Sequence, residues 1–249
     1  MNNSKNVNQI CKIENLFPKN IIAAFSVGKV NYDYRAEPAS EVLKNRKIFF
    51  SQLDVELAKA VFPMQVHKAD VAKVDERDRG RGEFSFEHGI AHTDALITNV
   101  KEVVLCLLTA DCLPIIFHEL SGKAIGIVHA GWKGIRLGVI EKTIQAMVNE
   151  FGVKPQDLKA FFAPAIGSCC YEVGLEFLDI FPDDISSRNQ TRFLDIKNLA
   201  KKKCLNAGIL PGSIKDVSVC TKCSNEKFFS YRSGDYLKRM LTIVAIKAG

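Results

Sequence analysis

The chain has 249 residues, of which 47% are hydrophobic and 25% charged, and this balance predicts a globular protein with a sizeable core. Its 34 Lys and Arg residues exceed its 28 Asp and Glu residues by 6 but are scattered, so we expect a small anionic substrate and no nucleic-acid partner. No apolar run without a charge is long enough to span a bilayer, and the N-terminus lacks an apolar leader core, so we expect no membrane contact and a cytoplasmic location.

In chain order, the sequence predicts a strand, two helices and two short strands before a polar loop. Four short runs rich in Val, Ile and Leu then predict strands buried on both faces. After them, apolar residues recur at helical spacing up to Phe151, and Gly152 ends the helix. The predicted strands are 21–27, 62–67, 69–74, 94–98, 103–108, 113–117, 124–129, 158–167 and 216–221; the predicted helices are 39–50, 54–61, 137–151, 172–181, 195–207 and 234–247; the loop is 76–92.

These elements alternate between strand and helix without regular pairing. No internal repeat, low-complexity tract or Pro/Gly/Ser linker divides the chain. We therefore predict a layered α/β fold of mixed α+β character, with mixed sheets, in which residues 1–249 form a single domain.

The eight cysteines are expected to be reduced, because disulfide frameworks belong mostly to short secreted domains. The segment "CTKC" at 220–223 is the only C-x-x-C motif, and a zinc ribbon needs a second pair. We expect Cys220 to lie near a functional site and Cys223 to be incidental. Cys169 and Cys170 are adjacent, and adjacent cysteines rarely bridge to each other.

Three candidate metal ligands, His67, Cys112 and His129, stand at the ends of predicted strands. The end of a strand exposes its side chain to a crevice, whereas the middle stays in the core. Two imidazoles and one thiolate suit Zn²⁺ and leave one tetrahedral position open, where a bound water is activated. The alternative is a buried thiol beside two hydrogen-bonded histidines that bind no metal.

Two carboxylates, Asp94 and Asp111, also lie at ends of apolar runs, where an unpaired charge is costly. Either could orient a ligand imidazole or act as a general acid or base. For Asp94, a turn or cap role after Thr93 is the alternative. In "HAGWKG" a glycine-rich turn leads into a helix, and Lys133 adds charge to a helix N-terminus that suits anions.

Six separated motifs resemble, in order and spacing, those of the laccase-domain or YfiH-like family, also called multicopper polyphenol oxidase-like or purine nucleoside phosphorylase. The resemblance is highly specific and covers about residues 62–249. It implies an α/β/β/α sandwich related to the catalytic domain of cytotoxic necrotizing factor toxins. The motifs are "MQVHKADV", "TDALIT", "LTADCLPIIF", "IVHAGWKG", "APAIGSCCYEVG" and "CTKCSNEKFFSYR".

The resemblance implies a metal site on His67, Cys112 and His129, filled by Zn²⁺ or by copper. The implied activity is cleavage of adenosine, inosine or methylthioadenosine with phosphate, together with deamination of adenosine. The partners are thus a small nucleoside and phosphate, and the oligomeric state stays open. In this scheme Asp94 or Asp111 would help to protonate the base, while four residues would bind substrate: Arg232 and Lys133 the phosphate, and Trp132 or Tyr171 the purine.

Two alternatives stay open. One is an amidase that edits cell-wall (peptidoglycan) precursors, with Cys112 as nucleophile or a metal-bound water as the attacking group. The toxin relative works with a Cys/His pair, which fits the first form. The other is a non-catalytic metal- or partner-binding protein with a closed four-ligand site that includes Cys220 or Cys223. Multicopper laccase chemistry is disfavoured, because five histidines cannot supply the roughly eight that a trinuclear cluster adds to a blue-copper site.

The N-terminal segment departs from the family pattern. The family usually reads "FSTRxGG" after its first strand, whereas this chain reads "FSVGKVNYDY". It therefore lacks the arginine and the glycine pair. If that arginine binds an anion, Lys29 and Arg35 are the candidates to replace it.

Overall fold

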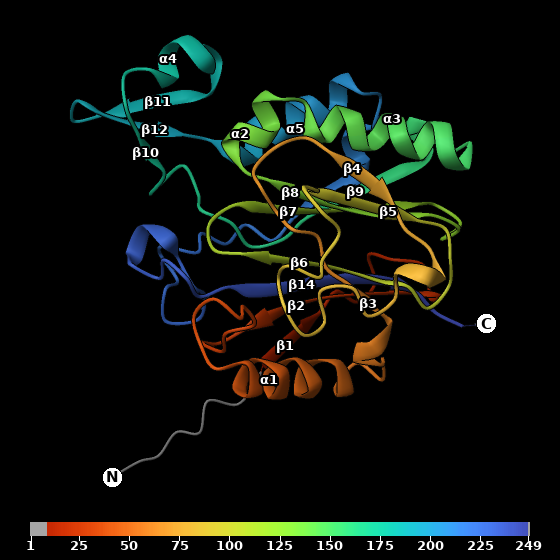
Figure 1. Ribbon diagram of the computed structural model, residues 1–249. Helices are drawn as coiled ribbons and strands as arrows, with labels where there is room; N and C mark the ends of the chain where they lie inside the picture. Colours follow the sequence, from red (N-terminus) through yellow and green to blue (C-terminus); the bar gives the residue numbers. More distant parts are fainter. Residues whose placement is uncertain (1–8, 249) are drawn as a thin grey trace.

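The computed structural model describes residues 9–248, and two β-sheets stacked face to face form most of its core (Figure 1). Helix α1 (Ala39–Ser51) covers the outer face of one sheet. Helices α3 (Val139–Phe151) and α5 (Ile196–Asn206) cover the outer face of the other. The layers thus run α/β/β/α, which confirms the predicted sandwich with mixed sheets. Residues 1–8, which belong to the N-terminal stretch expected to lack an apolar leader core, and residue 249 lie outside the described residues.

The first sheet has the order β1-β2-β14-β6-β3. β14 pairs antiparallel with both β2 and β6, whereas β3 runs parallel to β6. The middle strand β14 therefore comes from the C-terminal end of the described chain, and its neighbour β2 from near the N-terminal end. Its strands are β1 (Gln9–Lys12), β2 (Ile21–Val27), β3 (Ala60–Val61), β6 (Val104–Thr109) and β14 (Met240–Ile246).

The second sheet has the order β13-β9-β7-β8-β5-β4. Its centre is antiparallel, while β13 runs parallel to β9 and β4 runs parallel to β5 at the two edges. Its strands are β4 (Val71–Lys73), β5 (Ala95–Thr98), β7 (Leu113–Glu119), β8 (Ile125–Ala130), β9 (Leu158–Phe162) and β13 (Ile214–Asp216).

Alternate side chains of the central strands fill two different layers. In β6, Leu105 and Leu107 pack between the sheets, whereas Val104 and Cys106 pack on the side of α1. Successive side chains of a strand point to opposite faces, so a strand covered on both sides needs apolar residues at every position. The continuous run at 103–108 is the sequence signature of this arrangement.

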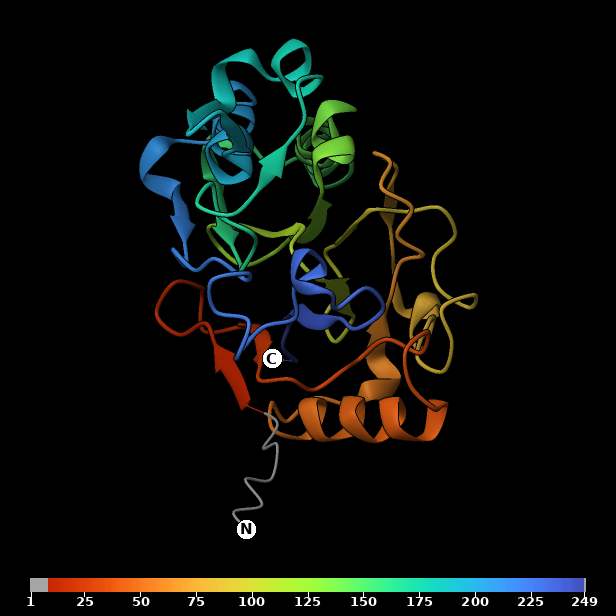
Figure 2. The same cartoon turned by 90° about the vertical axis from the view of Figure 1, so that its left-hand side faces the viewer.

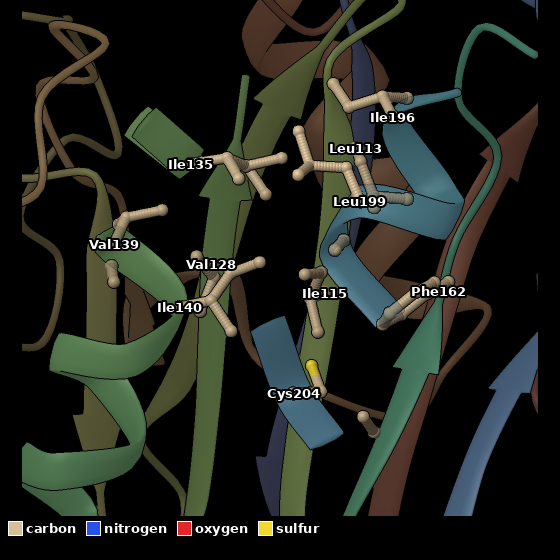
Figure 3. Packing of buried hydrophobic residues seen from close by; sticks show 14 of the residues in the cluster. Leu113, Ile115, Val128, Ile135, Val139, Ile140, Phe162, Ile196, Leu199 and Cys204 are labelled. Carbon is tan, nitrogen blue, oxygen red and sulfur yellow. The ribbon is translucent and has the colours of Figure 1, made fainter. Parts of the chain in front are cut away.

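A third layer of side chains lies between the second sheet and its helices. Figure 3 shows Ile115 of β7 and Val128 of β8 facing Ile140 of α3 and Leu199 of α5, and all four are buried. The apolar residues of α3 recur every three or four positions, which places them on one face of the helix. This packing positions β7, which begins at the candidate site, and β8, which ends there.

Residues 172–194 form a small antiparallel sheet beside the sandwich, in the order β10-β12-β11. Figure 2, turned by 90°, shows helix α4 at the end of the molecule opposite α1. The short helix α2 precedes α3, and Gly138, with φ of 82°, separates the two. These elements are β10 (Glu172–Val173), α4 (Phe177–Ile180), β11 (Ile185–Arg188), β12 (Thr191–Leu194) and α2 (Trp132–Arg136), and short 3₁₀ helices span Leu57–Lys59, Glu76–Asp78, Pro155–Asp157, Pro182–Asp184, Pro211–Ser213 and Tyr231–Ser233.

The prediction of a final helix over 234–247 was wrong, because this segment contains β14. All seven residues of β14 are buried, and the strand hydrogen-bonds to a neighbour on each side. Its apolar run was compatible with either state, but Thr242, Ile243 and Val244 are β-branched and favour a strand. Within the described chain, no helix is both long and apolar enough to cross a membrane.

Smaller differences concern element boundaries. The predicted strand 62–67 is largely a loop with one bridge, Pro63 to Ile90, and β3 lies just before it. The predicted helix 172–181 shrinks to α4, because β10 takes its first two residues. The helix predicted at 54–61 contains a single 3₁₀ turn. The strand predicted at 216–221 is shifted to β13.

Candidate metal centre and active site

His67, Cys112 and His129 meet at one end of the sandwich. His67 lies in the loop between β3 and β4, Cys112 in the turn between β6 and β7, and His129 in β8. Their donor atoms all lie within 4.8 Å of one another, and Cys112 Sγ is 3.9 Å from His67 Nε2. The β7–β8 pairing sets Leu113 opposite Ala130, which brings Cys112 to the end of β8. His67 is exposed, Cys112 is half-buried and His129 is buried.

Asp94 fixes the orientation of two of these residues. Its buried carboxylate accepts a hydrogen bond of 2.7 Å from His129 Nδ1. It also accepts from three successive backbone N–H groups, those of Val66 at 3.2 Å, His67 at 3.0 Å and Lys68 at 2.7 Å. His67 has a φ of 58°, and this left-handed conformation turns the neighbouring N–H groups toward one carboxylate. Because Nδ1 of His129 donates to Asp94, its Nε2 lone pair is free to bind a metal ion.

The three residues fit a tetrahedral metal ion with one open position. Imidazole nitrogen and thiolate sulfur are both ligands of Zn²⁺, and three protein ligands are typical of its catalytic sites. Gly131 leaves space for the thiol, because a Cβ at this position would lie 3.1 Å from Cys112 Sγ and 3.4 Å from His67 Cδ2. Gly131 has an ordinary φ of −75°, so its lack of a side chain matters for space and not for backbone conformation.

Cys112 and His129 also influence each other's charge. Burial raises the pKa of the Cys112 thiol, but the positive charge of His129 and hydrogen bonds from His129 and His67 outweigh burial and lower that pKa to about 6. Burial lowers the pKa of His129, but the Cys112 thiolate and the hydrogen bond to Asp94 outweigh it and raise that pKa to about 9. Without a metal, both shifts favour the form of the pair in which Cys112 is a thiolate and His129 an imidazolium.

Asp111 ties a late loop to the same strand end. Its buried carboxylate accepts hydrogen bonds from Thr221 Oγ1 at 2.5 Å, Ser230 Oγ at 3.0 Å and the backbone N–H of Arg232 at 2.8 Å. Its backbone carbonyl accepts from Ile166 N. The carboxylate thus anchors the loop between residues 220 and 232 directly beside Cys112.

Tyr171 and Arg232, two of the predicted substrate-binding residues, lie next to each other. The Arg232 guanidinium sits 5.1 Å from the centre of the Tyr171 ring and donates to the carbonyl of Glu172 at 2.7 Å. Burial raises the pKa of the Tyr171 hydroxyl, the negative charge of Cys112 raises it further and Arg232 lowers it, so this side chain lies within electrostatic reach of the thiol. Arg232 is exposed, with part of its charge open to a ligand.

Trp132 and Lys133, the other two, are on α2. Trp132 packs against Phe177 of α4, with ring centroids 4.8 Å apart. Lys133 is exposed, and its Nζ lies 5.6 Å from the Trp132 ring. Because α2 has five residues, it provides only a short helix dipole for the anion site predicted there.

The atypical N-terminal segment contacts the loop before β14, close to the metal centre. Lys29 forms an ion pair with Asp235 at 2.7 Å, and Arg239 N donates to Asn31 Oδ1. Arg35 is held by the buried carboxylate of Asp33 at 2.5 Å. The two cations proposed as replacements for the missing arginine are therefore both paired with carboxylates.

Arg239 is a candidate that the sequence prediction missed. Burial lowers the pKa of its guanidinium, while the negative charges of Asp33 and Cys112 raise it, so a half-buried cation lies within electrostatic reach of the thiol. The wrong helix over 234–247 hid this residue, since only a strand beginning at Met240 makes it a loop residue at a strand end. The β-branched run that follows was the signal that could have found it.

The chain is similar to several known proteins. The chain is 38% identical over 188 residues to a protein of Aquifex aeolicus named purine nucleoside phosphorylase, and the alignment covers 76% of this chain and 83% of the relative. It is 31% identical over 209 residues to adenosine deaminase RL5 of an unknown prokaryotic organism, with 80% and 79% covered. Among solved structures, the hypothetical protein YfiH of Bacillus licheniformis matches with a TM-score of 0.90 and 29% identity over 97% of each chain.

The family resemblance inferred from the six motifs is confirmed by a match to a family of known proteins. That match spans most of the chain, from residue 23 to residue 247, and so includes all three candidate metal ligands. The chain belongs to the family described as multi-copper polyphenol oxidoreductase laccase.

Proposed function

We propose that the protein is a zinc-dependent purine nucleoside phosphorylase that also deaminates adenosine. The observation that carries the proposal is a three-ligand site with an open position, on His67, Cys112 and His129, bordered by Tyr171 and Arg232. The relatives named purine nucleoside phosphorylase and adenosine deaminase support it. A zinc ion in this site would supply a Lewis acid and activate water.

The residues around the site would bind and orient the reactants. Phosphorolysis needs an anion held near C1′ of the ribose and a group that stabilises the purine as it leaves. Arg232 and Arg239 offer cationic hydrogen-bond donors for phosphate, and arginine suits such contacts. The buried Tyr171 ring offers a flat apolar face for the purine.

Asp94 and Asp111 would act by positioning other groups. Both carboxylates are buried and already engaged, with four hydrogen bonds to Asp94 and three to Asp111. A general acid needs access to the atom that it protonates. We therefore assign the imidazole orientation to Asp94 and the anchoring of the 220–232 loop to Asp111.

The test is an adenosine assay on zinc-loaded protein, with and without phosphate, in which adenine and inosine are measured separately. Cys112→Ala should abolish both products. Cys11→Ala, on the edge strand β1 and far from the site in the fold, is the matched control and should leave both unchanged. Adenine that requires phosphate supports phosphorolysis, and inosine formed without phosphate supports deamination. If the wild-type protein forms neither product, the nucleoside proposal is refuted.

One observation favours a second candidate, the amidase. Cys112, His129 and Asp94 form a thiol–imidazole–carboxylate series, as in nucleophilic thiol enzymes, and the Cys112 pKa is lowered. A thiol nucleophile would keep its activity on an amide of a wall precursor after zinc is removed. The nucleoside activity proposed above would be lost on the same treatment.

The histidine count supports the view that multicopper oxidation is not the activity. The chain has five histidines, and only His67 and His129 belong to a metal-capable group among the described residues. His118 instead packs against Phe17, with ring centroids 4.7 Å apart. Too few imidazoles therefore remain for a trinuclear copper cluster.

A cytoplasmic location stays a prediction.

A further inference from the structure

A second group of metal-capable side chains lies outside the site described above. Cys169 and Cys170 follow β9, and Cys220 and Cys223 form the C-x-x-C motif that follows β13. Their four sulfur atoms all lie within 4.8 Å of one another. We propose that these four thiols form a structural zinc site that ties the segment 167–173 to the 220–232 loop.

The distances between the sulfur atoms suit one tetrahedral ion. Zinc–thiolate bonds of about 2.3 Å place the sulfurs of a tetrahedron roughly 3.8 Å apart. Cys223 Sγ is 3.4 Å from both Cys169 Sγ and Cys170 Sγ, and the largest separation in the group stays within 4.8 Å. All four cysteines are free thiols. Small side-chain rotations would equalise these separations around an ion.

The backbone around Cys220 is arranged as for a thiolate ligand. The N–H of Gly167 donates to Cys220 Sγ at 3.2 Å, and the N–H of Cys223 also donates to it. Hydrogen bonds from N–H groups stabilise the charged form of a sulfur. A Cβ at Gly167 would lie 3.2 Å from both Cys169 Sγ and Cys220 Cβ, so a side chain there would crowd the two segments where they approach.

The charge and proton balance is straightforward. Four neutral thiols bind one Zn²⁺ and release four protons, which leaves a centre of net charge −2. Cationic side chains are close in sequence and structure: Lys222 lies within the motif, and Arg188 donates to the carbonyl of Ser168. No oxidant or further reactant is required.

Four protein ligands close the coordination sphere, so this site would hold structure and would not bind substrate. Its ligands adjoin the residues that border the first site. Cys170 precedes Tyr171, and Cys220 precedes Thr221, which donates to Asp111. Removing the ion would therefore loosen the loop that carries Arg232. This inference does not depend on which substrate the first site takes.

The test is the zinc content of protein purified under reducing conditions, measured together with the X-ray absorption of the metal. We expect two zinc ions per wild-type chain. Cys112→Ala should retain one ion with only sulfur neighbours, at about 2.3 Å. The double variant Cys169→Ser, Cys223→Ser should also retain one, now with nitrogen and sulfur neighbours. Both serines would be exposed, and Cys11→Ser serves as the matched control with two ions.

Retention of one ion in the double variant also shows that it has folded. Equal zinc contents in the wild type and the double variant would overturn the proposal. So would a disulfide between Cys223 and Cys169 or Cys170 found by mass spectrometry in freshly reduced, zinc-loaded protein. A four-sulfur shell around iron would overturn the assignment of zinc.

Discussion

Asp94→Asn tests whether the hydrogen bonds beneath the metal centre control metal binding. The wild-type carboxylate accepts four hydrogen bonds, three from the backbone at residues 66–68 and one from His129 Nδ1. The substitution keeps the shape of the side chain, but one oxygen becomes an –NH₂ group that donates. Two of the four donors therefore lose their acceptor.

The two orientations of the amide fail in different ways. If its oxygen replaces Oδ1, it still accepts from His67 N and His129 Nδ1, but its –NH₂ faces the N–H groups of Val66 and Lys68. If it is reversed, His129 has to accept at Nδ1 and carries its proton on Nε2, where it cannot bind a metal. Leaving two part-buried donors unpaired costs about 2 kcal/mol of unfolding free energy. Loss of such an orienting partner lowers metal affinity by about 10–100-fold.

The assay is a zinc titration in competition with a chromophoric chelator, combined with urea unfolding of the metal-free protein. Asp70→Asn is the control, because this neighbouring carboxylate is exposed and should change neither quantity. If folded Asp94→Asn binds zinc within about twofold of the wild-type affinity, the orienting role assigned to Asp94 is refuted.

Three further predictions concern the same site. Gly131→Ala should lower zinc affinity, because its Cβ would come within 3.1 Å of Cys112 Sγ; the same chelator competition checks this, and unchanged affinity would contradict the close packing. In metal-free protein, the alkylation rate of Cys112, followed by peptide mass spectrometry, should rise with pH around pH 6 and not around pH 8.5, because the lowered pKa keeps the thiolate at lower pH. His129→Ala should move this rise to higher pH, and an unchanged pH profile would argue against the interaction of Cys112 with His129. Arg239→Gln should raise the KM for phosphate about 10–100-fold, because a charged hydrogen bond is lost. The control Arg77→Gln, at an exposed arginine paired with Asp75, should leave that KM unchanged, and a wild-type KM in Arg239→Gln would exclude Arg239 from phosphate binding.

The sequence predicted the sandwich well because its central strands are buried on both faces. Such strands read as unbroken apolar runs, and those at 94–98, 103–108, 113–117 and 124–129 became β5 to β8 with ends shifted by at most two residues. β14 was missed, since an apolar segment seven residues long fits a buried helix as well as a strand. Only its pairing with β2 and β6 decides between them.

The candidate site was partly accessible to the same reasoning. His67, Cys112 and His129 could be grouped because each follows an apolar run. The four-cysteine cluster could not, because the second pair stands as "CC" and not as a C-x-x-C motif, and it lies 50 residues earlier in the chain. Neighbours brought together by long-range folding leave no local spacing to recognise. The prediction that Cys223 is incidental was therefore wrong, because its sulfur lies 3.4 Å from those of Cys169 and Cys170.

The place of β14 also affects how the chain folds. This strand comes from the end of the described chain, yet it fills the gap between β2 and β6, with partners such as Ala24 and Cys106 on either side of Ile243. During synthesis the N-terminal residues emerge first, and until residues 240–246 follow, β2 and β6 present unpaired backbone edges. Pairing across more than 200 residues makes sheet closure a late and slow step. A nascent chain stalled before Met240 would therefore expose the unpaired backbone edges of two apolar strands, β2 and β6, and would be prone to aggregate.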